Sequence, residues 1–107
     1  MERELARYVD PDIRLEDHGI LMLSGNFRGV GWAHGFGYPL DTEFLKRLMG
    51  VWRVEFLSDI DGKPCFVTHD YDRINKVEPI FLDEGEPFDV EEWCKRKGGV
   101  GAKMKSS

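Results

Sequence analysis

Four short runs of the chain are rich in apolar residues and are bounded by polar turn residues, a pattern typical of β-strands. We expect strands at 13–16, 20–27, 64–69 and 76–82. A turn is expected at 17–19, and Asp61–Gly62 is a strong turn signal before the third run. Residues 2–8 suit either a short helix or an extended lead-in that ends at Asp10–Pro11.

Glycine is concentrated in one part of the chain. Six of the twelve glycines fall between residues 19 and 37, and this density argues against a regular helix there. Segment 29–38 is therefore expected to be an irregular strand or an ordered loop, closed by Pro39.

A different spacing predicts the main helix at 42–52. Its apolar residues recur every three or four positions, which places them on one face. They are Phe44, Leu45, Leu48 and Trp52. Asp41 or Thr42 is the expected N-cap.

A short second helix is expected at 89–96, because Asp89 is followed three residues later by Glu92 in a capping box. Acidic residues open this helix and basic residues close it, as the helix dipole favours. The whole pattern predicts an α+β domain over residues 1–97, with a mostly antiparallel sheet of about four or five strands. Residues 98–107 are expected to form a flexible basic tail.

Charge is unevenly distributed within a net value of −5. Residues 95–107 hold five basic and no acidic side chains, whereas the other 94 residues hold 10 basic and 20 acidic ones. An acidic body repels phosphate backbones, so nucleic-acid binding is disfavoured. The longest apolar run, 20–23, is far too short to span a bilayer, and the acidic start of the chain predicts no secretory signal. We therefore expect a cytoplasmic protein without membrane association.

The two cysteines, Cys65 and Cys94, lie 29 positions apart and match no zinc motif. Free thiols in a reducing cytoplasm are expected in preference to a disulfide.

The first candidate for a binding surface combines histidines and aromatic rings with glycines, which let a ligand or partner approach the backbone closely. Its candidate contact residues are Asp17, His18, Trp32, His34, Phe36 and Tyr38. Aromatic side chains supply large contact areas at low entropic cost. The structural alternative is a strand in which Trp32, Phe36 and Tyr38 alternate into the core.

A second candidate surface is acidic and suits a basic partner. Its residues are Asp83, Glu84, Glu86, Asp89, Glu91 and Glu92. The alternative is an ordinary solvated face.

Signals for catalysis, metals or cofactors are weaker. His18, His34 and His69 have suitable chemistry for a metal, but their spacing matches no local motif. The segment that starts at Gly29 lacks the third glycine of a dinucleotide fingerprint, because His34 stands there. Neither cysteine has the context of a nucleophile, and no Gly-x-Ser-x-Gly is present. We expect no cofactor, no metal and no catalytic residue.

A series of short motifs runs in order along most of the chain. They are Glu16-Asp17-His18-Gly19-Ile20-Leu21, the segment 29–41, Glu43-Phe44, the segment 54–63 and the segment 83–88. Over about residues 15–90 this series resembles a family of small, uncharacterised bacteriophage and prophage proteins. That family has Gly-x-Gly-Gln-Gly-Phe-Gly-Gly-Tyr-x-Leu-Asp where this chain has residues 29–41. His34 replaces the family's usual glutamine, and one glycine before Tyr38 is lost. The resemblance implies a mobile-element origin and a bacterial cytoplasm, and it implies no activity.

The leading hypothesis is a phage-type accessory protein that acts by binding a host protein, as an inhibitor or adaptor in defence or nucleic-acid handling. One alternative is a small-molecule or nucleotide-binding module with a pocket between the glycine-rich segment and helix 42–52. Another is a metal-assisted hydrolase that uses the three histidines. An unpaired edge strand would also allow a homodimer.

Overall fold

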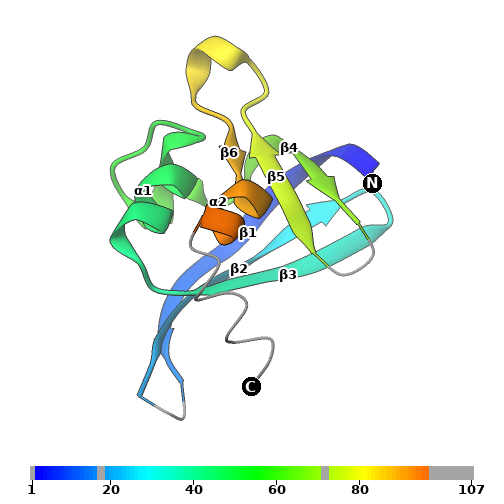
Figure 1. Ribbon diagram of the computed structural model, residues 1–107. Coiled ribbons are helices and arrows are strands. Elements are labelled where there is room, and N and C mark those ends of the chain that lie inside the picture. The colour runs from blue at the N-terminus through cyan, green and yellow to red at the C-terminus, as the bar shows by residue number, and fades with distance from the viewer. Residues whose placement is uncertain (1, 17–18, 71–72, 97–107) are drawn as a thin grey trace.

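The computed structural model describes residues 2–16, 19–70 and 73–96. Its elements are β1 (Glu2–Leu15), β2 (Leu21–Gly29), β3 (Trp32–Pro39), α1 (Thr42–Gly50), a 3-10 helix η1 (Leu57–Ile60), β4 (Lys63–His69), β5 (Ile74–Glu78), a 3-10 helix η2 (Leu82–Glu84), β6 (Phe88–Asp89) and α2 (Val90–Arg96). The strands form one curled antiparallel sheet in the order β3-β2-β1-β4-β5-β6, and α1 and α2 lie on its inner face (Figure 1). The α+β class is confirmed, but the sheet has six strands in the described chain, where four or five were expected.

Strand β1 is longer than expected, because the strand includes Asp10–Pro11. The strand continues to Leu15, and its pairing with β2 shifts register between Val9 and Asp12. At this bulge Asp10 has a φ of 55°, and its backbone N–H donates to Oδ1 of Asp61 at 2.9 Å. Proline has no N–H to offer a ladder, so a bulge is a position where a strand can contain it.

Two other boundaries differ from the expectation. The strand expected at 76–82 lies at Ile74–Glu78, and it ends before Pro79, which cannot donate to the sheet. The segment 29–38, expected to be an irregular strand or an ordered loop, contains the last residue of β2, a two-residue turn and most of the regular strand β3, which runs from Trp32 to Pro39.

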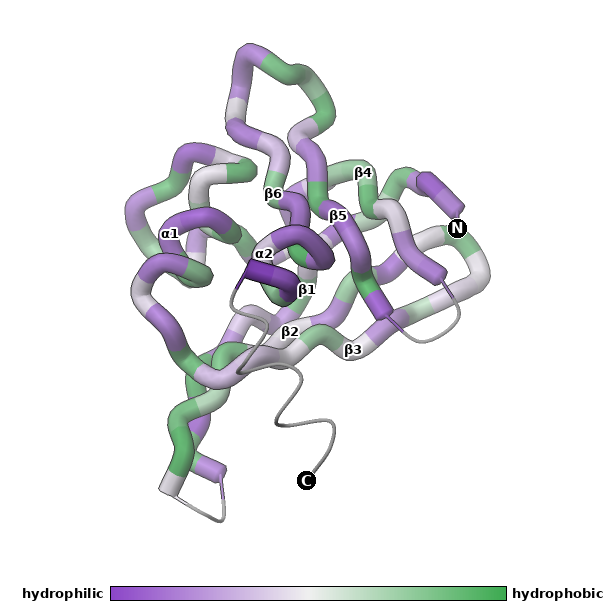
Figure 2. The backbone as a smooth tube through the Cα atoms, viewed as in Figure 1, coloured by the Kyte–Doolittle hydropathy of each residue, from purple (hydrophilic) through white to green (hydrophobic). Residues whose placement is uncertain are grey.

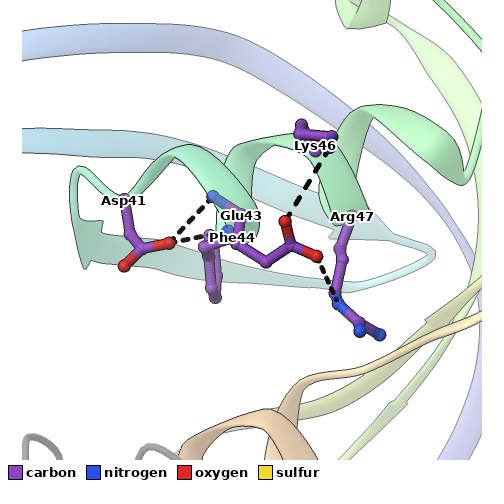
Figure 3. A network of polar contacts seen from close by, with 5 residues as sticks. All are labelled: Asp41, Glu43, Phe44, Lys46 and Arg47. Atoms are coloured by element: carbon purple, nitrogen blue, oxygen red, sulfur yellow. Dashed lines mark hydrogen bonds and ion pairs between the residues drawn. The ribbon is translucent and has the colours of Figure 1, made fainter.

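Helix α1 begins where the sequence predicts. Asp41 is the N-cap, and its Oδ1 accepts hydrogen bonds from the backbone N–H groups of Glu43 and Phe44 at 2.9 and 3.0 Å (Figure 3). The Glu43 carboxylate also faces Lys46 at 3.9 Å and Arg47 at 3.6 Å. The helix ends at Gly50, two residues earlier than expected.

Aromatic rings join α1 to the sheet. Phe44 is fully buried, and its ring stacks on Tyr38 with centroids 4.2 Å apart and planes 4° apart. Phe36, Phe88 and Trp93 surround the same ring. Burial of such side chains is the main favourable term in folding, so this cluster holds the two helices on the inner face of the sheet.

The capping box of α2 is confirmed at its first residue, because Oδ1 of Asp89 accepts a hydrogen bond from the N–H of Glu92 at 2.8 Å. Trp93 is buried, and its Nε1 donates to the Tyr38 hydroxyl at 3.2 Å. The expected tail at 98–107 lies outside the described residues. None of the helices in the described part of the chain is long and apolar enough to cross a membrane.

Candidate functional site

The aromatic residues expected at a binding surface lie on β3. Trp32, His34, Phe36 and Tyr38 alternate with Ala33, Gly35 and Gly37, so they share the inner face of the sheet. All four are half-buried, and the three aromatic ones pack against the core. The structural alternative, in which Trp32, Phe36 and Tyr38 alternate into the core, is therefore the arrangement observed.

Trp32 has a particular structural position. Its indole stacks on the imidazole of His69, with ring centroids 4.4 Å apart and planes 26° apart. A Cβ atom at Gly29, its partner across the hairpin, would overlap the indole. His69 in turn contacts Glu4 through Nε2 and Oε2 at 2.7 Å. The Trp32 side chain thus links β3 to β4 across the inner face of the sheet.

Of the three histidines considered as metal ligands in one alternative, the two that the structure describes have other partners. His34 uses Nδ1 in a 2.7 Å hydrogen bond with the carbonyl of Gly35, while His69 contacts Glu4. His18 lies outside the described residues. Within residues 2–16, 19–70 and 73–96, no three His, Cys, Asp or Glu side chains gather as metal ligands.

The cysteines show how burial limits nucleophilic chemistry. Neither Cys65 nor Cys94 is in a disulfide, as expected. Cys65 is fully buried, and this burial raises the pKa of its thiol to about 12. A thiol with that pKa is protonated at neutral pH, so it is a poor nucleophile.

The space considered for a ligand pocket between β3 and α1 is filled by stacked rings of Phe36, Tyr38 and Phe44. A hollow of about 300 Å³ lies instead beside α1. Its lining residues are Glu43, Lys46, Arg47, Gly50, Glu86 and Pro87. Within this hollow the carboxylate of Glu43 pairs with both Lys46 and Arg47 along α1, and Glu86 adds a second carboxylate.

The expected acidic surface consists of side chains with different roles. Asp83, Glu84, Glu86, Asp89 and Glu92 are exposed, and Glu91 is half-buried. Asp89 caps α2, and Glu91 pairs with Lys95 at 3.4 Å. These two side chains therefore stabilise α2.

The sequence analysis missed a set of exposed aliphatic residues on the hairpin that leads to Asp17 and His18. Asp17 and His18 themselves lie outside the described residues. On the strands beside them, Ile13 is 39% exposed, Leu15 67% and Leu21 47%. The apolar residues that predict these strands are also those expected on a buried face, so the sequence gives no sign that they are exposed.

The pairing of the strands explains this exposure. β4 pairs with β1 only from Glu2 to Tyr8, and β3 ends at Pro39, opposite Met22 of β2. The end of the β1–β2 hairpin, residues 12–15 and 21–24, therefore projects as an arm (Figure 1). Its β1 strand continues past the pairing with β4, while Met22 to Ser24 of its β2 strand still pair with β3. Many of the residues along the arm are hydrophobic, as the green parts of the tube show (Figure 2).

The arm has two unlike faces. Leu15 pairs with Leu21, and Ile13 pairs with the buried Leu23, so the three exposed side chains continue the core face outward. The opposite face carries Arg14 opposite Met22, and Arg14 forms a 3.0 Å ion pair with Asp12.

Comparisons with protein-family models, with curated proteins and with solved structures gave no match for this chain.

Proposed function

We propose that this protein acts by binding another protein, without chemistry of its own, and that the apolar face of the arm is the contact surface. The observation that supports this proposal is that Ile13, Leu15 and Leu21 are exposed on one face of a hairpin that projects from the body. Contiguous exposed apolar residues on a soluble domain mark interaction sites.

The geometry of the arm suits insertion into a groove. β1 extends past the end of its pairing with β4, and the exposed side chains on one face of the hairpin are aliphatic. The neighbouring charges of Arg14 and Asp12 neutralise each other on the other face. The partner surface is therefore an apolar groove that accepts a β-hairpin, and its fully desolvated centre supplies most of the binding energy.

The resemblance of residues 15–90 to phage and prophage proteins supports a bacterial host protein as the partner. In this proposal the chain is an inhibitor or an adaptor of that host protein, in the cytoplasm. Asp17 and His18 lie between the two strands of the arm in the sequence, so they belong to the same proposed contact segment.

Capture from a bacterial host lysate tests the proposal with two matched double variants. Leu15→Ser with Leu21→Ser removes the apolar face, and Arg14→Ser with Met22→Ser alters the opposite face of the same strands. Both pairs are exposed or half-buried, so we expect both variants to fold.

The expected result is one stoichiometric partner captured by the wild type and by the Arg14/Met22 variant, and lost from the Leu15/Leu21 variant. Equal capture by all three proteins, or no capture by any folded one, contradicts the proposal. Homodimerisation is a second proposed association and involves a different part of the sheet.

A further inference from the structure

The edge of the sheet formed by β3 is complementary to itself. We propose that two copies of this chain pair through β3, antiparallel and related by a two-fold axis at Gly35. This association is independent of the arm and of the partner proposed above.

The register of the β2–β3 hairpin determines which backbone groups of β3 remain free. Gly29 and Trp32 flank a two-residue turn, so they form a hydrogen-bonded pair, and such pairs recur at every second residue. The hydrogen bond from the N–H of Leu40 to the carbonyl of Leu21, 2.8 Å long, has the same parity. The N–H and C=O groups of Ala33, Gly35 and Gly37 therefore point away from β2.

These groups are open to solvent, although the carbonyl of Gly35 also accepts a 2.7 Å hydrogen bond from Nδ1 of His34. Within the described chain β3 is the terminal strand of the sheet and pairs with β2 alone. Ala33, Gly35 and Gly37 are all exposed, and the exposed area of a glycine is backbone area. A Cβ atom added at Gly35 would meet only Oδ1 of Asn26, at 3.8 Å. An incoming strand can thus reach this backbone once the imidazole of His34 leaves the Gly35 carbonyl.

β3 also lacks the features that natural edge strands use to prevent pairing. Residues 32–39 include no Asp, Glu, Lys or Arg, and the register with β2 runs without a bulge. Proline occurs only at the end of the strand, as Pro39. An uncharged edge strand of eight residues without a bulge is a template for another strand.

The residues of β3 identify a second copy as the strand that fits. In an antiparallel pair centred on Gly35, Ala33 of one copy lies opposite Gly37 of the other, so small residues meet on the outer face. On the inner face Trp32 lies opposite Tyr38, and His34 lies opposite Phe36. Aromatic cross-strand pairs stabilise a sheet, and a two-fold axis forms each of these pairs twice.

A charge-exchange experiment tests this register. Gly35→Lys alone and Gly35→Glu alone place like charges directly opposite each other at the axis, so we expect self-association to weaken about ten-fold or more. An equimolar mixture of the two variants places Lys opposite Glu, and we expect a heterodimer. Sedimentation velocity gives the masses, and thermal unfolding shows whether each variant is folded.

Two controls make the outcome specific. Gly35→Ala keeps the free N–H group and has room for its methyl, so it is expected to remain a dimer. The Leu15→Ser/Leu21→Ser variant is also expected to remain a dimer, because its changes lie on the arm. A monomeric wild type up to about 1 mM, an unchanged Gly35→Lys dimer, or a monomeric arm variant overturns the proposal.

Discussion

The ring of Tyr8 lies over Gly25 of the neighbouring strand, in the space that a side chain at Gly25 would occupy. Tyr8 is fully buried and packs against Phe27, Phe36 and Trp52. The same relationship exists between Trp32 and Gly29. On the inner face of β2, glycine thus leaves room for large rings from the strands on either side. These glycines have a packing role, whereas the sequence suggested that they give a ligand or partner access to the backbone.

Gly25→Ala is expected to lower the free energy of unfolding by about 2 kcal/mol, because the added methyl overpacks a ring that is held on several sides. Gly35→Ala is the matched control on β3, where the methyl has room, and its effect is expected within about 0.5 kcal/mol. Urea unfolding followed by tryptophan fluorescence measures both. Equal effects of the two substitutions contradict this account of Gly25.

Trp32→Ala is expected to destabilise the fold by about 2 kcal/mol, because a half-buried indole loses its contact with His69 and with the core. Val30→Ala is the control from the turn of the same hairpin, where Val30 is 98% exposed, and no change is expected there. Thermal and urea unfolding compare the two. A stable Trp32→Ala protein shows that the indole is free for another role.

Stability is expected to fall at alkaline pH. Burial raises the pKa of the Cys65 thiol to about 12, and burial also raises the pKa of the Tyr8 hydroxyl. Above pH 9 the unfolded chain releases the thiol proton while the folded chain keeps it. The free energy of unfolding therefore decreases by about 1.4 kcal/mol per pH unit for this group until about pH 12.

Cys65→Ala isolates this contribution. Urea unfolding at pH 8, 9 and 10 is expected to show a shallower pH dependence in the variant, since Tyr8 begins to contribute only above about pH 10. An identical slope in both proteins shows that the Cys65 thiol is not the source.

Asp89→Ala is expected to cost about 1 kcal/mol of stability, because α2 loses the carboxylate that accepts the N–H of Glu92. Glu84→Ala removes an exposed carboxylate from the same acidic surface and is expected to leave stability unchanged. Differential scanning calorimetry measures both midpoints. Similar midpoints for the two variants contradict a structural role for Asp89.

The candidate site was predictable only in part. The period-two alternation at Trp32, Phe36 and Tyr38 was visible in the sequence, but it cannot say whether an aromatic face meets a ligand or the protein's own helix. Phe44 of α1 occupies the space in front of those rings, and the structure thus makes them core residues. The exposed face at Leu15 and Leu21 carries the pattern of a buried strand, so its exposure was not predictable from alternation.

The sequence by itself determined the features that depend on near neighbours in the chain. The caps at Asp41 and Asp89, the turn at Asp61–Gly62 and the side-chain alternation of β3 follow from local hydrogen bonds and strand geometry. Tertiary structure decided where β1 ends. The carboxylate of Asp61 accepts a hydrogen bond from the N–H of Asp10 at a bulge, and this bulge allows the strand to continue past Pro11. Tertiary structure also decided that the arm projects, because the lengths of β3 and β4 are set by pairing between distant segments, which local patterns do not encode.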